Sequence, residues 1–454
     1  MRIHLIAIGG AAMHNLAIAL NYNHHTVSGS DDEIYNPSKK RLQKHGLLPE
    51  TMGWNPDRIT KDIDIIILGM HAHKDNPELK KAKKIGLKIY SYPEFLFQHA
   101  KNKQRVVIAG SHGKTTTTSI ILHVLKSNKI DFDYLVGAQI EGFDSMVRLS
   151  DAPLMVVEGD EYLSSPIDRR PKILHYKPHV TVVTGIAWDH INVFPTFKNY
   201  KSQFAKYIKT IEKGGTLFFY KNDEHVNDIL EKIKKPTFQA EAYEAFESTL
   251  KDGKTIILNE KGKPVALGIF GKHNLENLRA AYLVCKKVGV TEAQFFKTIK
   301  SFKGAAKRLQ LLQKTKTCLA FLDFAHAPSK VEATMKSLKA QYPKRKLIAC
   351  LELHTFSSLN KEFLTEYVRT MDAADKAIVY FSEHTLAMKK LPPISTDEVK
   401  AAFDHSNMEV VTDNTKVLSI LKRFKWENKN LVMMTSGNFG GLDLKKETKK
   451  LIGN

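Results

Sequence analysis

Short apolar runs alternate with amphipathic stretches along almost the whole chain. The runs are rich in β-branched residues, which is typical of buried strands. The clearest are residues 3–8, 26–31, 63–69, 105–109, 154–157, 180–186, 318–323, 347–353, 377–381 and 431–434. Helical periodicity follows several of them, as between Thr117 and Lys129, where apolar residues recur on one helix face. Strands that alternate with helices predict an α/β fold built on parallel sheets.

Two polar stretches without apolar periodicity divide the chain. The first is residues 101–103, and the second, residues 303–308, leads into the last set of strands. A length of 454 residues agrees with about three domains of roughly 150 residues each. We therefore predict three domains: Rossmann-like at residues 1–103, P-loop ATPase-type at residues 104–308, and Rossmann-like at residues 309–454.

A glycine-rich turn joins the strand at residues 105–109 to the helix that follows. The turn consists of Gly110, Ser111, His112, Gly113, Lys114, Thr115 and Thr116. Glycines permit a tight turn in which backbone N–H groups and a helix N-terminus face one anion. A lysine such as Lys114 then reaches the outer phosphates, and the Thr115 hydroxyl suits Mg²⁺. This shortened P-loop, with Ile108 in place of its usual first glycine, predicts ATP binding.

Two further strand ends carry groups suited to the same phosphates. Glu158 ends the strand at residues 154–157, the usual position of a Mg²⁺ ligand beside a phosphate loop, although acidic strand ends also occur simply as solvated loops. His190 follows the strand at residues 180–186 and is either structural or directed at the phosphates.

A third polar segment precedes a helix predicted at residues 278–287. It holds His273, Asn274 and Asn277, and the two asparagines lie three positions apart. On a helix start they share a face, so they are placed either to hydrogen-bond an adenine edge or to cap the helix.

The N-terminal strand and turn are typical of the first unit of a doubly wound sheet, where phosphates commonly bind. Ser30 and Asp31 end the second strand, where an acid usually meets a sugar hydroxyl. His71 follows the third strand and is either a ligand or a polar loop residue. The glycine fingerprint is weak, because Ala7 and His14 occupy glycine-like places. A nicotinamide-dependent oxidoreductase is therefore an alternative, although it would have no use for the second phosphate loop.

Net charge and cysteine content limit the classes of binding partner and the cellular compartment that we expect. The formal net charge is +21, from 69 Lys and Arg against 48 Asp and Glu, which suits either nucleic acid or a phosphate-bearing substrate. The lysines are dispersed and no nucleic-acid motif appears, so we expect a phosphate-bearing substrate, with a nucleic-acid-directed protein as the alternative. Three scattered cysteines and the lack of a long apolar run predict a cytoplasmic protein without a membrane partner.

The order of these motifs resembles the Mur ligase family of ATP-dependent peptide-bond-forming ligases. The motifs are GSHGKTTT, EGDEY, WDH, GKHNLEN, KRLQLL and LDFAHAP, and they span essentially the whole chain. Within the family the chain is most similar to the murein peptide ligases, on MRIHLIAIGG, GSD, DFAH and NFGG. The resemblance implies an ATP-dependent ligase that joins UDP-N-acetylmuramate to L-alanyl-γ-D-glutamyl-meso-diaminopimelate through an acyl phosphate. The family branch that adds L-alanine to the same nucleotide sugar is the alternative.

The resemblance also implies roles for individual residues. Lys114 would hold the γ-phosphate and Arg308 the transferring phosphoryl group. One Mg²⁺ would be bound by Thr115 and Glu158, and a second by His190. The other expected contacts are His273, Asn274 and Asn277 near the adenine, Asp323 at the ribose, Ser30, Asp31 and His71 at the UDP moiety, and His326 and His354 at the acceptor.

Two positions depart from the family pattern on the acceptor side. His326 is followed by Ala327 where relatives tend to have a second histidine, and His354 stands where murein peptide ligases tend to have arginine. These departures leave the acceptor open between the tripeptide and L-alanine.

Overall fold

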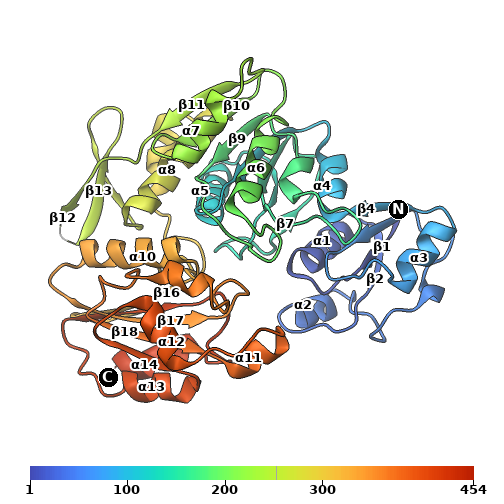
Figure 1. The fold of residues 1–454 in the computed structure, drawn as a ribbon. Helices are drawn as coiled ribbons and strands as arrows, with labels where there is room; N and C mark the ends of the chain where they lie inside the picture. Colours follow the sequence, from blue (N-terminus) through green and yellow to red (C-terminus); the bar gives the residue numbers. More distant parts are fainter. Residues whose placement is uncertain (252, 454) are drawn as a thin grey trace. The chain divides into compact units, whose positions relative to one another are not determined.

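The computed structural model describes residues 1–251 and 253–453 and confirms the α/β fold class (Figure 1). Within these residues the strands form four sheets, and no helix there is long and apolar enough to cross a bilayer. The chain divides into two compact units. The first comprises Met1–Ile186, Lys201–Glu244 and Arg279–Thr298, and the second comprises Ala187–Tyr200, Ala245–Leu278 and the chain from Ile299 onward.

The first unit begins with a four-stranded parallel sheet in the order β2-β1-β3-β4. Its strands and helices are β1 (Arg2–Ile6), α1 (Ala11–Tyr22), β2 (Thr26–Ser30), α2 (Ser38–Lys44), β3 (Ile65–Leu68), α3 (Pro77–Lys84), β4 (Lys88–Ser91) and α4 (Tyr92–Ala100). Ile3 pairs with Val27 on one side and with Ile65 on the other. Because the strands are parallel, the turns after β1, β2 and β3 all open at one edge of the sheet.

The central sheet has seven strands in the order β11-β10-β9-β5-β8-β6-β7. The strands are β5 (Gln104–Ala109), β6 (Asp133–Leu135), β7 (Val147–Arg148), β8 (Leu154–Glu158), β9 (Val180–Val183), β10 (Thr216–Tyr220) and β11 (Gln239–Tyr243). The helices between β5 and the start of the last sheet are α5 (Lys114–Ser127), α6 (Phe197–Ile208), α7 (Glu224–Glu231), α8 (Lys272–Lys287) and α9 (Glu292–Ile299). Since β5 pairs with both β8 and β9, the glycine turn after β5 lies between the ends of these two strands.

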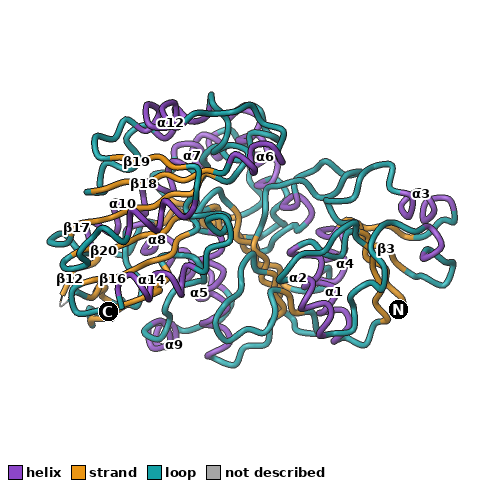
Figure 2. The backbone as a smooth tube through the Cα atoms, turned by 90° about the horizontal axis from the view of Figure 1, so that it is seen from below, coloured by secondary structure: helices purple, strands orange, loops and turns teal. Residues whose placement is uncertain are grey.

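The second unit contains two sheets. A small antiparallel sheet consists of β12 (Ser248–Lys251), β13 (Lys254–Leu258) and β14 (Pro264–Leu267). The larger sheet has the order β15-β16-β20-β17-β18-β19, and only β15 is antiparallel to its neighbour. Its strands are β15 (Gln310–Lys314), β16 (Cys318–Asp323), β17 (Lys346–Leu353), β18 (Lys376–Phe381), β19 (Met408–Val411) and β20 (Lys429–Met434), and Figure 2 shows β16 to β20 as adjacent tubes.

Both faces of this larger sheet are covered by apolar cores. The helices of this region are α10 (Pro328–Gln341), α11 (Glu383–Met388), α12 (Thr396–Phe403), α13 (Asn414–Leu421) and α14 (Leu444–Ile452). Val331 and Met335 of α10 join one core, and Val417 of α13 joins the other. Two covered faces explain why the strands of this sheet read as continuous apolar runs rather than as an alternating pattern.

Two helices begin earlier than the apolar pattern predicts. The helix expected from Thr117 begins at Lys114, because Gly113 takes the left-handed conformation at its N-cap. The helix expected at residues 278–287 begins at Lys272. Polar first turns hide both starts from a reading of apolar periodicity.

Candidate active site

The phosphate loop runs from β5 into α5 as a turn that requires glycine at two positions. Gly110 has φ 123° and Gly113 has φ 77°. A Cβ atom on Gly110 would lie 2.3 Å from Thr184 Oγ1, far inside van der Waals contact. The Ser111 N–H donates to Gly185 O at 2.8 Å and so fixes the loop to the end of β9. The N-terminus of α5 therefore faces the sheet edge, as an anion site requires.

Lys114 is held by an acidic partner. Its Nζ lies 2.7 Å from Glu161 Oε2 and 2.6 Å from Gly110 O. Burial disfavours the ammonium, but three neighbouring carboxylates, first among them Glu161, outweigh burial and raise the pKa of Lys114. Lys114 therefore stays charged at neutral pH, which phosphate binding needs.

Thr115 and Glu158 meet at the start of the same helix. Thr115 Oγ1 donates to Glu158 Oε1 at 2.6 Å, and Glu158 Oε2 accepts the Gly137 N–H at 2.6 Å. Hydroxyl and carboxylate oxygens are ligands that Mg²⁺ prefers. These two oxygen ligands therefore fit the Mg²⁺ ion that the sequence predicts at Thr115 and Glu158. The metal-binding role itself stays a prediction.

The turn after β1 gathers residues expected at the UDP moiety. The Gly9 N–H donates to Asp31 Oδ2 at 2.7 Å, and a Cβ atom on Gly10 would lie 3.6 Å from His71 Nδ1. Burial, reinforced by the neighbouring Asp32, raises the pKa of Asp31 to about 7. The structure therefore brings Asp31 and His71 to one turn, where Asp31 changes charge near neutral pH.

Ser30 has a different position from the one expected at a ligand. Its side chain is fully buried, and its hydroxyl donates to Glu78, which is itself fully buried on α3. Its backbone oxygen accepts the N–H groups of Ala7 and Ile8. Ser30 therefore fixes the end of β2 through its hydroxyl and its backbone oxygen, and its expected contact with UDP stays a prediction.

The weak glycine fingerprint has a structural explanation. Ala7 has φ 67°, the left-handed conformation that a glycine supplies more easily. His14 is buried on α1, with Nδ1 2.9 Å from Gly10 O and 3.1 Å from Ser38 Oγ. The turn keeps its shape at both positions without glycine.

In the second unit, His190 and His326 belong to one charged cluster with Asp189 and Lys330. Asp189 Oδ1 accepts the backbone N–H of His190 at 2.8 Å, and Asp189 Oδ2 lies 3.2 Å from Lys330 Nζ. Burial opposes ionisation of Asp189, but Lys330 and the two histidines outweigh it and hold its pKa well below the usual range. Burial, helped by Lys330, lowers the pKa of His326 to about 4. The His326 imidazole is therefore neutral at pH 7.

Asp323 serves the turn that carries Arg308. Its Oδ2 accepts the Leu309 N–H at 2.6 Å, and its Oδ1 accepts the Ala325 N–H at 2.7 Å. The Arg308 guanidinium lies 4.7 Å from the centre of the Phe324 ring. Asp323 therefore positions the Arg308 segment, and its expected contact with a ribose stays a prediction.

The segment expected near the adenine lies inside α8 rather than before it. Asn274 and Asn277 are both buried, and neither precedes the helix, so the capping alternative is wrong. Asn274 Nδ2 donates to Phe270 O at 2.8 Å. His273 Nδ1 lies 3.1 Å from Ser337 Oγ, and burial lowers the pKa of His273. The adenine contacts of all three residues stay predictions.

His354 follows β17 beside a buried carboxylate. Its Nδ1 lies 3.8 Å from Glu352 Oε1, and Glu352 Oε2 accepts the Phe439 N–H at 2.8 Å and the Thr435 hydroxyl. A Cβ atom on Gly437 would lie 3.0 Å from His354 Cγ. The ends of β17 and β20 thus meet in the polar cluster where the sequence predicts the acceptor.

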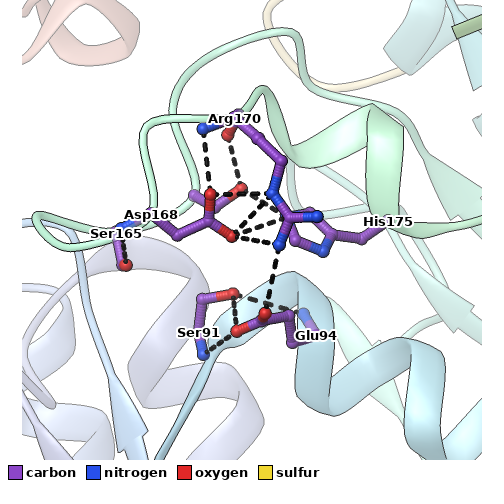
Figure 3. A network of polar contacts seen from close by, with 7 residues as sticks. Ser91, Glu94, Ser165, Asp168, Arg170 and His175 are labelled. Atoms are coloured by element: carbon purple, nitrogen blue, oxygen red, sulfur yellow. Dashed lines mark hydrogen bonds and ion pairs between the residues drawn. The ribbon is translucent and has the colours of Figure 1, made fainter.

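A second group of potential metal ligands lies in the first unit, away from the phosphate loop. Glu94, Asp168 and His175 each place a ligand atom within 4.8 Å of the others. Figure 3 shows the Arg170 guanidinium between the two carboxylates, 2.7 Å from Asp168 Oδ2 and 3.4 Å from Glu94 Oε1. Because the Arg170 guanidinium already contacts both carboxylates, we interpret the group as an ion-pair network that joins α4 to the segment after β8.

Three family models match successive parts of the chain. They are the Mur ligase family catalytic domain at residues 2–104, the Mur ligase middle domain at residues 108–285, and the Mur ligase glutamate ligase domain at residues 307–438. The chain belongs to the Mur ligase family. It therefore has the three-domain architecture of the family and is an ATP-dependent ligase that forms C–N bonds. The oxidoreductase alternative is wrong, and the exact domain boundaries at residues 103 and 308 stay predictions.

Individual relatives of this Mur ligase carry two kinds of name. A UDP-N-acetylmuramate–L-alanine ligase of Caldicellulosiruptor saccharolyticus is 32% identical over 83% of each chain. A murein peptide ligase of Psychrobacter arcticus has a TM-score of 0.69, with 22% identity over 100% of this chain and 99% of the other. A UDP-N-acetylmuramate:L-alanyl-γ-D-glutamyl-meso-diaminopimelate ligase of Neisseria meningitides has a TM-score of 0.60, with 27% identity over 66% of this chain and 98% of the other.

The structure adds site residues of this Mur ligase that sequence reasoning missed. Glu161 stands within the EGDEY motif but gives no signal of its pairing with Lys114. Gly137 is an isolated glycine between strands, where a Cβ atom would lie 2.8 Å from Glu158 Oε1. Lys330 looks like any exposed helix lysine in the sequence. Only the folded chain shows which acid or base each of them meets.

Proposed function

We propose that this Mur ligase joins the carboxylate of UDP-N-acetylmuramate to the amine of the tripeptide L-alanyl-γ-D-glutamyl-meso-diaminopimelate, in peptidoglycan recycling. The observation that carries the proposal is the geometry of the phosphate loop. In this loop Lys114 forms an ion pair with Glu161, and Thr115 donates a hydrogen bond to Glu158. Two relatives support UDP-N-acetylmuramate as the substrate that supplies the carboxylate. One is named for L-alanine and the other for the tripeptide, and both names include UDP-N-acetylmuramate. The turn with Asp31 and His71 is the place we assign to the UDP moiety.

The first step activates the carboxylate. A carboxylate oxygen attacks the γ-phosphorus of ATP, an O–P bond forms, the bond from phosphorus to the bridging oxygen breaks, and ADP leaves. Lys114 and the N–H groups of the glycine turn hold the outer phosphates and offset the charge that develops on ADP. We assign Arg308 as the second cation, which would contact the phosphoryl group as it is transferred.

Thr115 and Glu158 would hold Mg²⁺, which supplies charge neutralisation across the phosphate oxygens when bound. The third predicted ligand, His190, is less suited to this ion, since Mg²⁺ favours oxygen over imidazole nitrogen. The Glu158 carboxylate is held in place by the Gly137 N–H, so it keeps its orientation whether or not Thr115 remains its partner.

The second step forms the amide. The acceptor amine attacks the acyl carbon, a C–N bond forms, and the C–O bond to phosphate breaks. Inorganic phosphate leaves with the electron pair, and the amine loses a proton. His326 and His354, at the ends of β16 and β17, are the residues we assign to the acceptor.

L-Alanine is the second candidate acceptor. It is favoured by a specific observation, the 32% identity to a relative named for that amino acid. The tripeptide is favoured by the motifs of the murein peptide ligases in this sequence and by the 27% identical structure named for that substrate.

The two acceptors are separated by one assay. ADP release and product mass are measured with UDP-N-acetylmuramate and Mg²⁺, with L-alanine or the tripeptide added singly. We expect turnover with the tripeptide and a product heavier by the tripeptide less one water. Turnover with L-alanine alone would replace the acceptor, and no ATP consumption with either would overturn the proposed function.

A further inference from the structure

Lys389 is a half-buried lysine in the second unit that has no acidic partner among the residues that the structure describes. It follows α11, and its Nζ lies 4.3 Å from the centre of the Phe356 ring. Burial lowers the pKa of Lys389, and within the described residues no carboxylate forms an ion pair with it. The ring face offsets part of the cost of desolvating the ammonium, but a ring replaces a carboxylate only weakly.

Two other half-buried lysines of the same unit have carboxylate partners, whereas the Nζ of a third, Lys429, donates to the backbone oxygens of Lys425 and Glu427. Lys330 Nζ lies 3.2 Å from Asp189, and Lys376 Nζ lies 2.7 Å from Glu409. A charge that is removed from water is normally neutralised in this way. Burial of the Lys389 ammonium is therefore unfavourable, and binding of an anion from outside the chain would offset this effect.

The charge of Lys389 reaches the cluster at the ends of β17 and β20. Burial lowers the pKa of His354, Glu352 opposes this effect, and Lys389 adds to it. Phe356, under the Lys389 ammonium, belongs to the same loop as His354. In the loop after β20, the buried Ser436 hydroxyl has no hydrogen-bond partner within the described part of the chain. Lys389 thus supplies a positive charge beside this cluster. The cluster also includes the Ser436 hydroxyl, a hydrogen-bond donor that no described protein group uses.

We propose that Lys389, together with Phe356 and His354, forms a carboxylate subsite for the acceptor. The subsite binds a carboxylate that is remote from the attacking amine. This inference rests on the proposed function and deepens it, because the tripeptide has such carboxylates, whereas the single carboxylate of L-alanine lies next to its amine. Lys389 is then a specificity-determining residue that favours an acidic peptide.

Three variants test the subsite in the full-length chain. Lys389→Met keeps the aliphatic stem and removes the charge, whereas Lys389→Arg keeps the charge. Lys390→Met is the matched control, since Lys390 is the exposed neighbouring residue. With saturating ATP and UDP-N-acetylmuramate, we expect Lys389→Met to raise KM for the tripeptide about tenfold with little change in kcat. Lys389→Arg should restore most of the loss, and Lys390→Met should match the wild type.

A KM for the tripeptide in Lys389→Met equal to that of the wild type would overturn the subsite while leaving the proposed function intact. Turnover of the wild type with L-alanine alone would overturn both. If the wild type shows no turnover, the proposed function fails, and calorimetric titration of the full-length chain with the tripeptide decides the subsite separately. Weaker binding to Lys389→Met than to Lys390→Met supports it, and equal or undetectable binding in both overturns it.

Discussion

At the phosphate loop, Lys114 and Glu161 depend on each other. Glu161 is 2% exposed and contacts the Lys114 ammonium at 2.7 Å. Lys114→Met removes the cation that holds the outer phosphates, so we expect kcat for ADP release to fall about 100-fold or more. The same change removes the ammonium that neutralises the buried Glu161 carboxylate, which should lower the free energy of unfolding by about 3 kcal/mol. Steady-state kinetics and urea unfolding measure the two effects.

A second variant separates catalysis from stability at this pair. In Lys114→Met with Glu161→Gln, the buried charge is gone, and we expect most of the stability to return while ADP release stays low. Recovery of activity in the double variant would show that Lys114 acts only by neutralising Glu161.

Asp31 gives the first unit a pH dependence of definite sign. Folding raises its pKa from 3.8 to about 7, so the folded state keeps a proton that the unfolded chain releases between these values. The free energy of unfolding should therefore fall as pH rises from about 4 to about 7. Asp31→Asn still accepts the Gly9 N–H but does not titrate, so the variant should exceed the wild type by roughly 1–3 kcal/mol at pH 8.

Urea unfolding at pH 5 and pH 8 checks the Asp31 prediction. The advantage of Asp31→Asn should be smaller at pH 5, where the wild-type carboxyl is mostly protonated. An equal difference at the two pH values would mean that Asp31 ionises normally in the folded chain.

Residue chemistry was predictable where a motif dictates it and not where the partner is distant in sequence. Thr115 and Glu158 were predicted as a pair, and they lie 2.6 Å apart. The family resemblance places Ser30 near UDP, which stays a prediction, but it gives no sign that the Ser30 hydroxyl donates to Glu78 on α3. The position of a residue at the end of a strand indicates the edge of the sheet at which it lies. It does not indicate the direction in which its side chain points.

At the scale of the element, the strand–turn–helix from β5 to α5 depends on the absence of a side chain at Gly110. Gly110→Ala would place Cβ 2.3 Å from Thr184 Oγ1 and 2.8 Å from Thr184 N, at φ 123°. We expect a loss of about 2–4 kcal/mol in the free energy of unfolding, together with loss of ATP binding. Urea unfolding and titration with a fluorescent ATP analogue measure both.

Gly214→Ala is the matched control for Gly110→Ala. Gly214 also has a positive φ, 77°, but among the described residues other than its chain neighbours no atom lies within 4 Å of its Cβ position. Backbone strain alone should cost about 1 kcal/mol there, with ATP binding unchanged. Equal losses in the two variants would show that strain, rather than the contact with Thr184, sets the requirement for glycine.

Elements were predicted well where apolar residues repeat and less well at polar ends. The strands around the phosphate loop follow their apolar runs, whereas α5 and α8 begin in polar segments that carry no periodicity. The antiparallel strands β12 to β14 were not predicted, because they are short and mostly exposed on one face. Periodicity reports burial, so it fails where an element is held by turns or by a ligand-binding end.

At the scale of the whole molecule, the sequence indicated three domains, and the compact units of the structure cut across them. The first unit contains all of residues 1–186 and so includes both the first predicted domain and the phosphate loop. Asp133, fully buried at the start of β6, helps to explain this. It lies 2.8 Å from His99 Nε2 and 2.6 Å from Lys103 Nζ, both at the end of the first predicted domain. A contact between residues this far apart in sequence leaves no local signal.

Asp133→Asn should therefore loosen the first unit. Burial opposes ionisation of Asp133, but His99, Lys103 and Ser150 outweigh it and lower its pKa, so its stabilisation is present at pH 7 and lost as pH falls below about 4. We expect urea unfolding at pH 7 to show a loss of about 3 kcal/mol. Asp131→Asn, which breaks only the exposed pair with Arg148, should cost less than about 0.5 kcal/mol. If the two variants lose the same stability at pH 7, then Asp133 does not tie the four-stranded sheet of β1 to β4 to the central sheet, and the unity of residues 1–186 must come from apolar packing alone.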